Sequence, residues 1–188
     1  MKVRLMVAVA VLAAAARGGV WLMTESYRHP TAWEYEVVTM NLLQGRGFVF
    51  DYLGIPYRSY HPPLFDWLSV VVYTLVGHHQ AAILVMQGLF TCLLAALTVH
   101  LTQRVTGSLG CGVAAGGLVA THPGLLYYDT HHLHPLSFGA LLFAVIIWAA
   151  LRWSSTRRLR DAAWLGASVA LAMHERGTAG LFLLPAIV

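Results

Sequence analysis

Long apolar stretches alternate with short polar ones along most of this 188-residue chain. An α-helix needs roughly 20 apolar residues to cross the hydrocarbon core of a bilayer. The stretches that approach or exceed this length are Lys2 to Met23, Ala81 to Leu101, Thr106 to Leu126, Leu133 to Trp153 and Ala162 to the end. The pattern therefore predicts an all-α membrane protein with about five transmembrane helices.

The first apolar run has a second interpretation. Met1-Lys-Val-Arg supplies a basic start, and Ala13 to Ala16 could supply the small residues of a signal-peptide cleavage site. Under either interpretation, the chain after residue 24 emerges on the far side of the membrane.

Residues 24–79 form the predicted outer loop, which contains the longest polar stretch. Its residues Trp33, Val37, Met40 and Leu43 recur at helical spacing, with Leu42 as an alternative to Leu43. They predict an amphipathic helix of about three turns that ends at Gly45 and lies along the membrane surface. The apolar stretch Leu64 to Gly77 is too short to span comfortably, so it predicts a second interfacial or re-entrant helix.

Thr31 and Glu34 have the spacing of a capping box at the start of the first surface helix. In that motif the Thr31 hydroxyl would accept from the N3 amide, and the Glu34 carboxylate would bond the Thr31 amide. Glu36 lies two residues beyond Glu34, about 200° around a helix, so the two glutamates should face different surroundings.

Three features inside the apolar segments predict helix contacts or a helix break. Arg17 lies too deep in the first run to snorkel, so it should pair with another helix or face a wet cavity. Gly112 and Gly116 have the small-xxx-small spacing of close helix contacts. His174-Glu175-Arg176, beside Gly177, predicts a broken helix or a tight turn at a cavity, or alternatively an interfacial position.

The chain ends within an apolar run at Pro185-Ala-Ile-Val188. We therefore expect residues 1–188 to be a single N-terminal transmembrane portion of a larger protein. A complete small five-helix protein is the alternative.

Composition and charge agree with a membrane location. Only 11% of residues are charged, 58% are hydrophobic and the mean hydropathy is +0.65, whereas about 25% charged residues are usual in soluble domains. The basic residues that would lie inside are Lys2, Arg4, Arg104, Arg152, Arg157, Arg158 and Arg160. These short basic loops explain the net charge of +4 without nucleic acid. The sequence predicts an integral protein of a prokaryotic cytoplasmic (inner) membrane, with its N-terminus inside.

Two motifs in the outer loop resemble a known family. They are "EYxxxxxNLLxGRGF", which begins at Glu34, and "HPPLF", which begins at His61. With the order of apolar runs, they resemble the N-terminal part of the GT-C integral-membrane glycosyltransferases. The similar branch includes dolichyl-phosphate-mannose protein mannosyltransferases and lipid A aminoarabinose transferases. The resemblance implies a sugar passed from a polyprenyl-phosphate donor to an acceptor at the outer face of the membrane.

Such a transfer requires a base for the acceptor hydroxyl and cations for the phosphate leaving group. The candidate catalytic carboxylates are Glu34, Glu36 and Asp51, and the candidate donor-binding residues are Arg46, Arg58 and His61. Four of these six residues have a plainer alternative role: Glu34 as a cap, Glu36 facing solvent, Asp51 bonding loop amides, and His61 in a turn. Thr31 occupies a position where the family often has Asp, so the chain departs from the common pattern there.

Asp129, His131 and His134, with His132 between them, are the densest set of possible metal ligands. A divalent ion held there could bind the donor phosphate, and an ordinary outer loop is the alternative. Beyond this possible divalent metal ion, the sequence does not identify a cofactor. The expected partners are the lipid bilayer, a polyprenyl-phosphate-linked sugar and an acceptor that the sequence does not name.

The sequence thus predicts a glycosyltransferase portion. The alternative from a different class is a non-catalytic multispan membrane protein, either a degenerate remnant or a transporter segment. A transporter would carry broken helices in repeated halves, and only the segment around Glu175 has this character.

Overall fold

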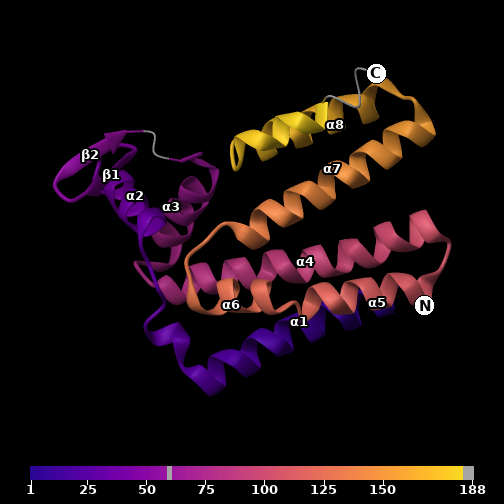
Figure 1. The fold of residues 1–188 in the computed structure, drawn as a ribbon, viewed down its shortest axis with the longest axis horizontal. Coiled ribbons are helices and arrows are strands. Elements are labelled where there is room, and N and C mark those ends of the chain that lie inside the picture. Colours follow the sequence, from indigo (N-terminus) through magenta and orange to yellow (C-terminus); the bar gives the residue numbers. More distant parts are fainter. Residues whose placement is uncertain (59–60, 184–188) are drawn as a thin grey trace.

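The computed structural model describes residues 1–58 and 61–183, which form a bundle of apolar helices with a small module at one end (Figure 1). The bundle helices are α1 (Lys2–Thr24), α4 (Gln80–Thr106), α5 (Leu109–Ala120), α6 (Pro123–His131), α7 (Leu136–Thr156) and α8 (Leu159–Met173). The end module, called here the outer module, comprises η1 (Ser26–Arg28), α2 (Glu34–Leu43), β1 (Val49–Tyr52), β2 (Ile55–Arg58) and α3 (Leu64–Val76). A 3₁₀ segment, η2 (Gly177–Leu183), follows α8.

The apolar helices confirm the predicted all-α membrane fold. Among the described residues, three helices (α1, α4 and α7) are long and apolar enough to cross a bilayer. The pair α5 and α6, bent by 41°, would make a fourth span. The fifth predicted span begins as α8, a helix of 15 residues that ends at Met173.

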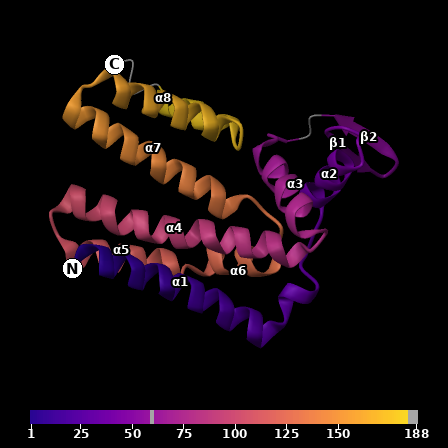
Figure 2. The same ribbon diagram turned by 180° about the vertical axis from the view of Figure 1, so that it is seen from behind.

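The seven basic residues predicted to lie inside are gathered at one end of the bundle. The N-terminus, the α4–α5 turn and the α7–α8 turn lie together there, and the outer module lies at the opposite end (Figures 1 and 2). The fold therefore places the basic turns and the outer module at opposite ends of the bundle.

Arg17 of α1 has the interhelical partner that its depth in the span predicts. Its Nε atom lies 2.8 Å from Oδ2 of Asp129 in α6, and both side chains are buried. Its Nη1 atom donates to the carbonyl oxygens of Ala13 and Ala120 at 2.9 Å and 3.0 Å. Since Ala120 ends α5 and Pro123 begins α6, the guanidinium satisfies a carbonyl that the helix break leaves without an intrahelical donor.

Gly112 and Gly116 bring α5 against α4, which confirms the packing predicted from their spacing. A Cβ atom at Gly112 would lie 2.7 Å from the carbonyl oxygen of Val99. At Gly116 it would lie 2.5 Å from Val99 Cγ2 and 2.9 Å from the carbonyl oxygen of Ala95. The helix backbones approach so closely that only glycine fits at these two positions.

Both predicted surface helices are present, as α2 and α3, but the predicted capping box is wrong. Trp33 precedes the first residue of α2, and no side chain caps that end. The Thr31 amide instead donates to the carbonyl oxygen of His131 at 2.7 Å, and its carbonyl accepts from the Leu133 amide at 3.1 Å. These backbone bonds hold Thr31 in an extended conformation against residues 131–133 at the end of α6. The helix therefore begins later than the motif predicts.

The antiparallel hairpin of β1 and β2 is an element that the sequence analysis did not predict. Its two loop residues, Leu53 and Gly54, have φ values of 50° and 79°. Positive φ at both positions is the conformation that two-residue hairpin loops favour. Glycine adopts it readily and leucine does not, which is why the loop was not apparent from the sequence.

The predicted break around Glu175 is present. After α8 ends at Met173, the turn at residues 174–176 leads into η2, and Gly180 lies against the Met173 side chain. The carbonyl oxygen of His174 accepts from the Leu64 amide at 3.1 Å. The turn is thereby fixed to the first residue of α3.

Candidate functional site

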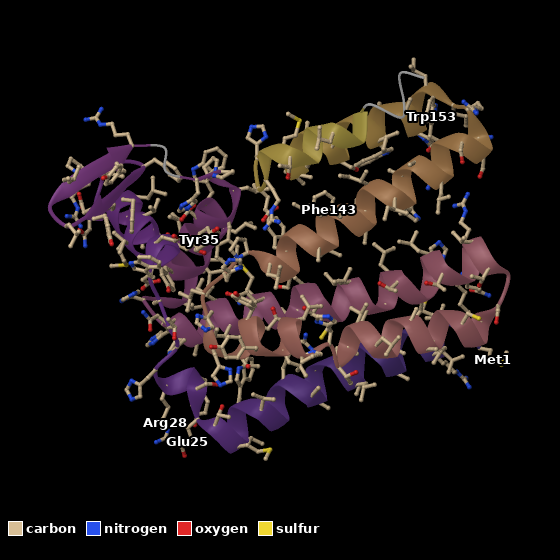
Figure 3. All side chains as sticks on the ribbon, in the orientation of Figure 1. Met1, Glu25, Arg28, Tyr35, Phe143 and Trp153 are labelled. Carbon is tan, nitrogen blue, oxygen red and sulfur yellow. The ribbon has the colours of Figure 1, made fainter. Side chains whose placement is uncertain are left out.

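Tyr35, in the first turn of α2, lies where the outer module meets the bundle (Figure 3). Its ring centroid is 4.4 Å from that of His61, 5.4 Å from that of Phe65 in α3, and 5.7 Å from that of His134 beside α7. Segments that are far apart in the sequence therefore converge on one aromatic side chain. Burial and the nearby carboxylates Glu34, Asp66 and Glu175 raise the pKa of Tyr35, so its hydroxyl stays protonated at neutral pH.

His61 and Asp66 form a hydrogen bond next to this ring. Nε2 of His61 lies 2.7 Å from Oδ2 of Asp66, which is fully buried. Pro63 precedes α3 and Asp66 lies in its first turn, so the helix dipole and the imidazole both favour the carboxylate. Burial nevertheless raises the pKa of Asp66, and the hydrogen bond from His61 opposes that rise. The carboxylate fixes the orientation of the imidazole, as in many catalytic histidines.

Glu175 and Arg176 reach the same region from the turn after α8. Glu175 is buried, and a Cβ atom at Gly139 of α7 would lie 2.8 Å from its Oε2 atom. Burial raises the pKa of Glu175, and the neighbouring Arg176 charge opposes this rise. Because Gly139 has no side chain, there is room for the Glu175 carboxylate beside α7.

His134 completes the region from the loop between α6 and α7. Its Nδ1 atom accepts from the Leu136 amide at 3.1 Å, so the neutral ring carries its proton on Nε2. Burial, followed by the charge of Arg176 and by His132, lowers the pKa of His134 to about 4. The imidazole is consequently neutral at physiological pH.

Glu34 and Glu36 face different surroundings, as the sequence predicts. Glu34 is half-buried and lies close enough to Tyr35 to raise its pKa. Glu36 accepts from the hydroxyl of Tyr73 at 2.6 Å, and its other oxygen contacts Nε2 of His78. It ties α2 to the end of α3, so the expectation that it faces solvent is wrong.

We call the set Tyr35, His61, Asp66, His134, Glu175 and Arg176, together with Glu34, the Tyr35 cluster. It combines three carboxylates, two histidines, a tyrosine and an arginine at one end of an apolar bundle. The family model for dolichyl-phosphate-mannose-protein mannosyltransferases matches residues 60–188. The chain belongs to this family. No curated protein and no solved structure matches it.

Membership in the dolichyl-phosphate-mannose-protein mannosyltransferase family makes the chain GT-C-like, as its motifs indicate. A family of this kind comprises membrane glycosyltransferases, and the apolar helices agree with that environment. The matched region contains His61, Asp66, His134, Glu175 and Arg176. Glu34 and Tyr35 lie before it, in the segment that carries the first motif.

The other residues considered for this family's chemistry lie outside the Tyr35 cluster. Asp51 is exposed in β1 and accepts from Nδ2 of Asn41 at 3.3 Å. Arg46 is exposed in the turn after α2, and Arg58 is exposed in β2. Of the predicted donor-binding residues, the structure brings only His61 into the Tyr35 cluster.

The predicted metal ligands do not come together. Asp129 faces Arg17, and Thr91 donates to its Oδ2 atom at 2.7 Å. His131 stacks on Tyr127, with ring centroids 5.2 Å apart, whereas His134 packs on Tyr35. Within residues 1–58 and 61–183 there is no group of three or more such side chains arranged to hold a metal ion.

Sequence reasoning missed Tyr35, Asp66 and Glu175 as members of one site. Two signals were present: Asp66 follows "HPPLF" directly, and Glu175 is an acid within an apolar run. Neither signal shows that the two residues meet, because 109 positions separate them in the numbering and only the packing of α3 against the end of α8 joins them.

Proposed function

We propose that this protein transfers a sugar from a polyprenyl-phosphate donor to an acceptor at the outer face of the membrane. The observation that carries the proposal is the convergence of Glu34, His61 and Arg176 around Tyr35, at the end of the bundle opposite the basic turns. A donor whose lipid lies in the bilayer would present its phosphate and sugar at such a place.

In this proposal, Glu34 is the general base. It would take the proton of the acceptor hydroxyl as that oxygen attacks the anomeric carbon. The bond from the anomeric carbon to the phosphate oxygen then breaks, and the polyprenyl phosphate leaves with the electron pair. A positioned base of this kind contributes about 10² to 10⁴-fold to a rate.

His61 and Arg176 are the proposed contacts of the leaving phosphate. Hydrogen bonds from an arginine and an imidazole N–H stabilise the charge that develops on the leaving oxygens. Asp66, which lies 2.7 Å from Nε2 of His61, fixes the orientation of that ring and acts as a positioning residue. Tyr35, protonated at neutral pH, can donate a hydrogen bond to the sugar.

The two glutamates of α2 provide a matched test. The protein, reconstituted in liposomes, would be given a polyprenyl-phosphate-linked mannose, and consumption of the donor would be followed with and without added saccharide acceptors. We expect Glu34→Gln to lower the rate at least about 100-fold and Glu36→Gln to leave it within about threefold, since Glu36 is held by Tyr73 and His78.

Each outcome decides something. Equal rates for Glu34→Gln and wild type would remove Glu34 as the base. If only Asp51→Asn lost activity, the catalytic site would be placed on the hairpin instead. Complete absence of donor consumption by the wild-type protein, with correct folding and membrane insertion, would favour the non-catalytic alternative.

A further inference from the structure

One face of the β1–β2 hairpin is lined by aromatic side chains. The register pairs Phe50 with Tyr57 and Tyr52 with Ile55, so Phe50, Tyr52 and Tyr57 project from the same face. Trp33, at the start of α2, packs edge-on against two of these rings, with centroids 6.2 Å from Phe50 and 6.4 Å from Tyr52. These four side chains line a hollow of about 370 Å³, here called the aromatic cradle.

Three of the four rings in the aromatic cradle are open to solvent. Trp33 is 59% exposed, and Tyr52 and Tyr57 are each 43% exposed, whereas Phe50 beneath them is 3% exposed. Exposed tryptophan and tyrosine side chains grouped around a hollow are typical of binding surfaces. Phe50 thus forms the floor, and the exposed rings form the walls.

The position of the hairpin argues against a lipid chain as the occupant. It lies at the end of the outer module farthest from the bundle (Figures 1 and 2), so it is outside the slab that the apolar helices define. The lining chemistry argues against a charged ligand, because all four side chains are uncharged. What they offer is flat apolar ring faces with an indole N–H and phenolic hydroxyls at the edges.

A saccharide has the matching chemistry. A pyranose ring presents a face of C–H groups that packs on an aromatic ring, and its hydroxyls surround that face like the polar edges of the aromatic cradle. We propose that the aromatic cradle binds a neutral saccharide, one to a few sugar units long. That this saccharide is the acceptor, or part of it, rests on the function proposed above.

The aromatic cradle is distinct from the Tyr35 cluster but adjacent to it in the chain. Trp33 lines the cradle, and Tyr35, two residues later, centres the cluster. Phe48, just before β1, packs against His61 with ring centroids 5.5 Å apart. A saccharide held in the cradle could therefore extend along the outer module toward the place where the sugar is transferred.

Binding is best measured without any donor, on the intact protein in detergent or nanodiscs. The probe is mannotriose, titrated by calorimetry and checked by saturation-transfer NMR. We expect saturable binding that Trp33→Ala and Tyr57→Ala each weaken by about tenfold, the equivalent of about 1.4 kcal/mol. Trp67→Ala is the matched control, because Trp67 is an aromatic residue of the same module that is 50% exposed and does not line the hollow. It should leave affinity within about twofold.

Three outcomes would overturn the proposal: no saturable binding of mannotriose, equal affinity in Trp33→Ala and wild type, or binding of hexaproline in place of mannotriose. The last would identify a peptide-binding surface, which aromatic-lined grooves also form. Tyr57→Ala is a second test in case Trp33→Ala disturbs folding, since Tyr57 lies in the exposed strand β2. Donor consumption with water as acceptor, measured separately, distinguishes loss of saccharide binding from failure of the proposed transferase function.

Discussion

Nε of Arg17 and Oδ2 of Asp129 lie 2.8 Å apart in the interior of the bundle, where they join α1 to α6. Burying such a pair is costly, and removing one partner leaves the other charge without compensation. Because Arg17 also bonds the Ala120 carbonyl at the end of α5, the pair fixes the bend between α5 and α6. That bend leads the chain into the loop carrying His134.

We expect Arg17→Leu or Asp129→Leu, each alone, to destabilise the protein by about 3 to 5 kcal/mol. The double variant should recover part of that loss, because neither charge remains buried. Thermal unfolding in detergent measures the effect. The control is Arg28→Leu, which breaks the exposed contact with Glu25 at 3.1 Å and should cost about 1 kcal/mol or less. Equal losses for the two arginines would contradict a structural role for the buried pair.

Two neighbouring glycines of α5 should respond oppositely to alanine. At Gly116 the added methyl group would lie 2.9 Å from the carbonyl oxygen of Ala95, so α4 and α5 must separate. At Gly117 it would meet nothing within 4 Å. We expect Gly116→Ala to lower stability by about 1 to 3 kcal/mol, as overpacking does. Gly117→Ala should be neutral or stabilising by up to about 1 kcal/mol. Unfolding temperatures of the two variants, compared side by side, decide the matter.

The hydroxyl of Tyr73 should hold the outer module together through Glu36. Tyr73→Phe removes the 2.6 Å bond to the Glu36 carboxylate and leaves that half-buried group with fewer donors, at a cost of about 1.5 to 3 kcal/mol. Amide hydrogen exchange should become faster in α2 and α3, with little change in α4 and α7. The control Tyr27→Phe alters an exposed tyrosine outside these helices. Uniform acceleration in all helices would mean that the contact supports global rather than local stability.

The pH dependence of stability should reveal the buried state of His134. Its pKa is lowered to about 4 in the fold, against about 6.5 in an unfolded chain. Between these values the unfolded state binds more protons than the folded one, so stability rises with pH. This contribution is complete above about pH 6.5 and is lost as the pH falls toward 4.

The raised pKa values of Asp66 and Glu175 act in the opposite direction, since the folded state there retains protons that the unfolded state loses. The comparison with His134→Asn isolates the histidine, because asparagine keeps an acceptor for the Leu136 amide and does not titrate. Between about pH 7 and pH 5, the unfolding temperature of wild type should fall more than that of His134→Asn. Parallel curves would show that His134 is not buried in its neutral form.

The sequence by itself determined the features that depend on local pattern and on the cost of burying polar groups in lipid. Apolar runs of sufficient length form helices in a bilayer because their backbone groups must be satisfied within the segment. The cost of burying charge likewise predicted a partner or a wet cavity for Arg17, and a helix break at residues 174–176 with an interfacial position as the alternative. The spacing of Gly112 and Gly116 predicted a close contact with a neighbouring helix. Both surface helices of the outer loop also followed from spacing and length.

Only the tertiary structure decided which segments meet. The predicted capping box is absent because the backbone of Thr31 bonds His131 and Leu133, about 100 positions later in the numbering. A local sequence motif cannot indicate such a long-range hydrogen bond. Tertiary contacts also pair Glu36 with Tyr73 and His78, and Asp129 with Arg17. The hairpin with the Leu53-Gly54 loop places on one face the rings that line the aromatic cradle. The Tyr35 cluster exists because α3, α7 and the end of α8 pack together, and long-range packing of this kind leaves no periodic trace in the sequence.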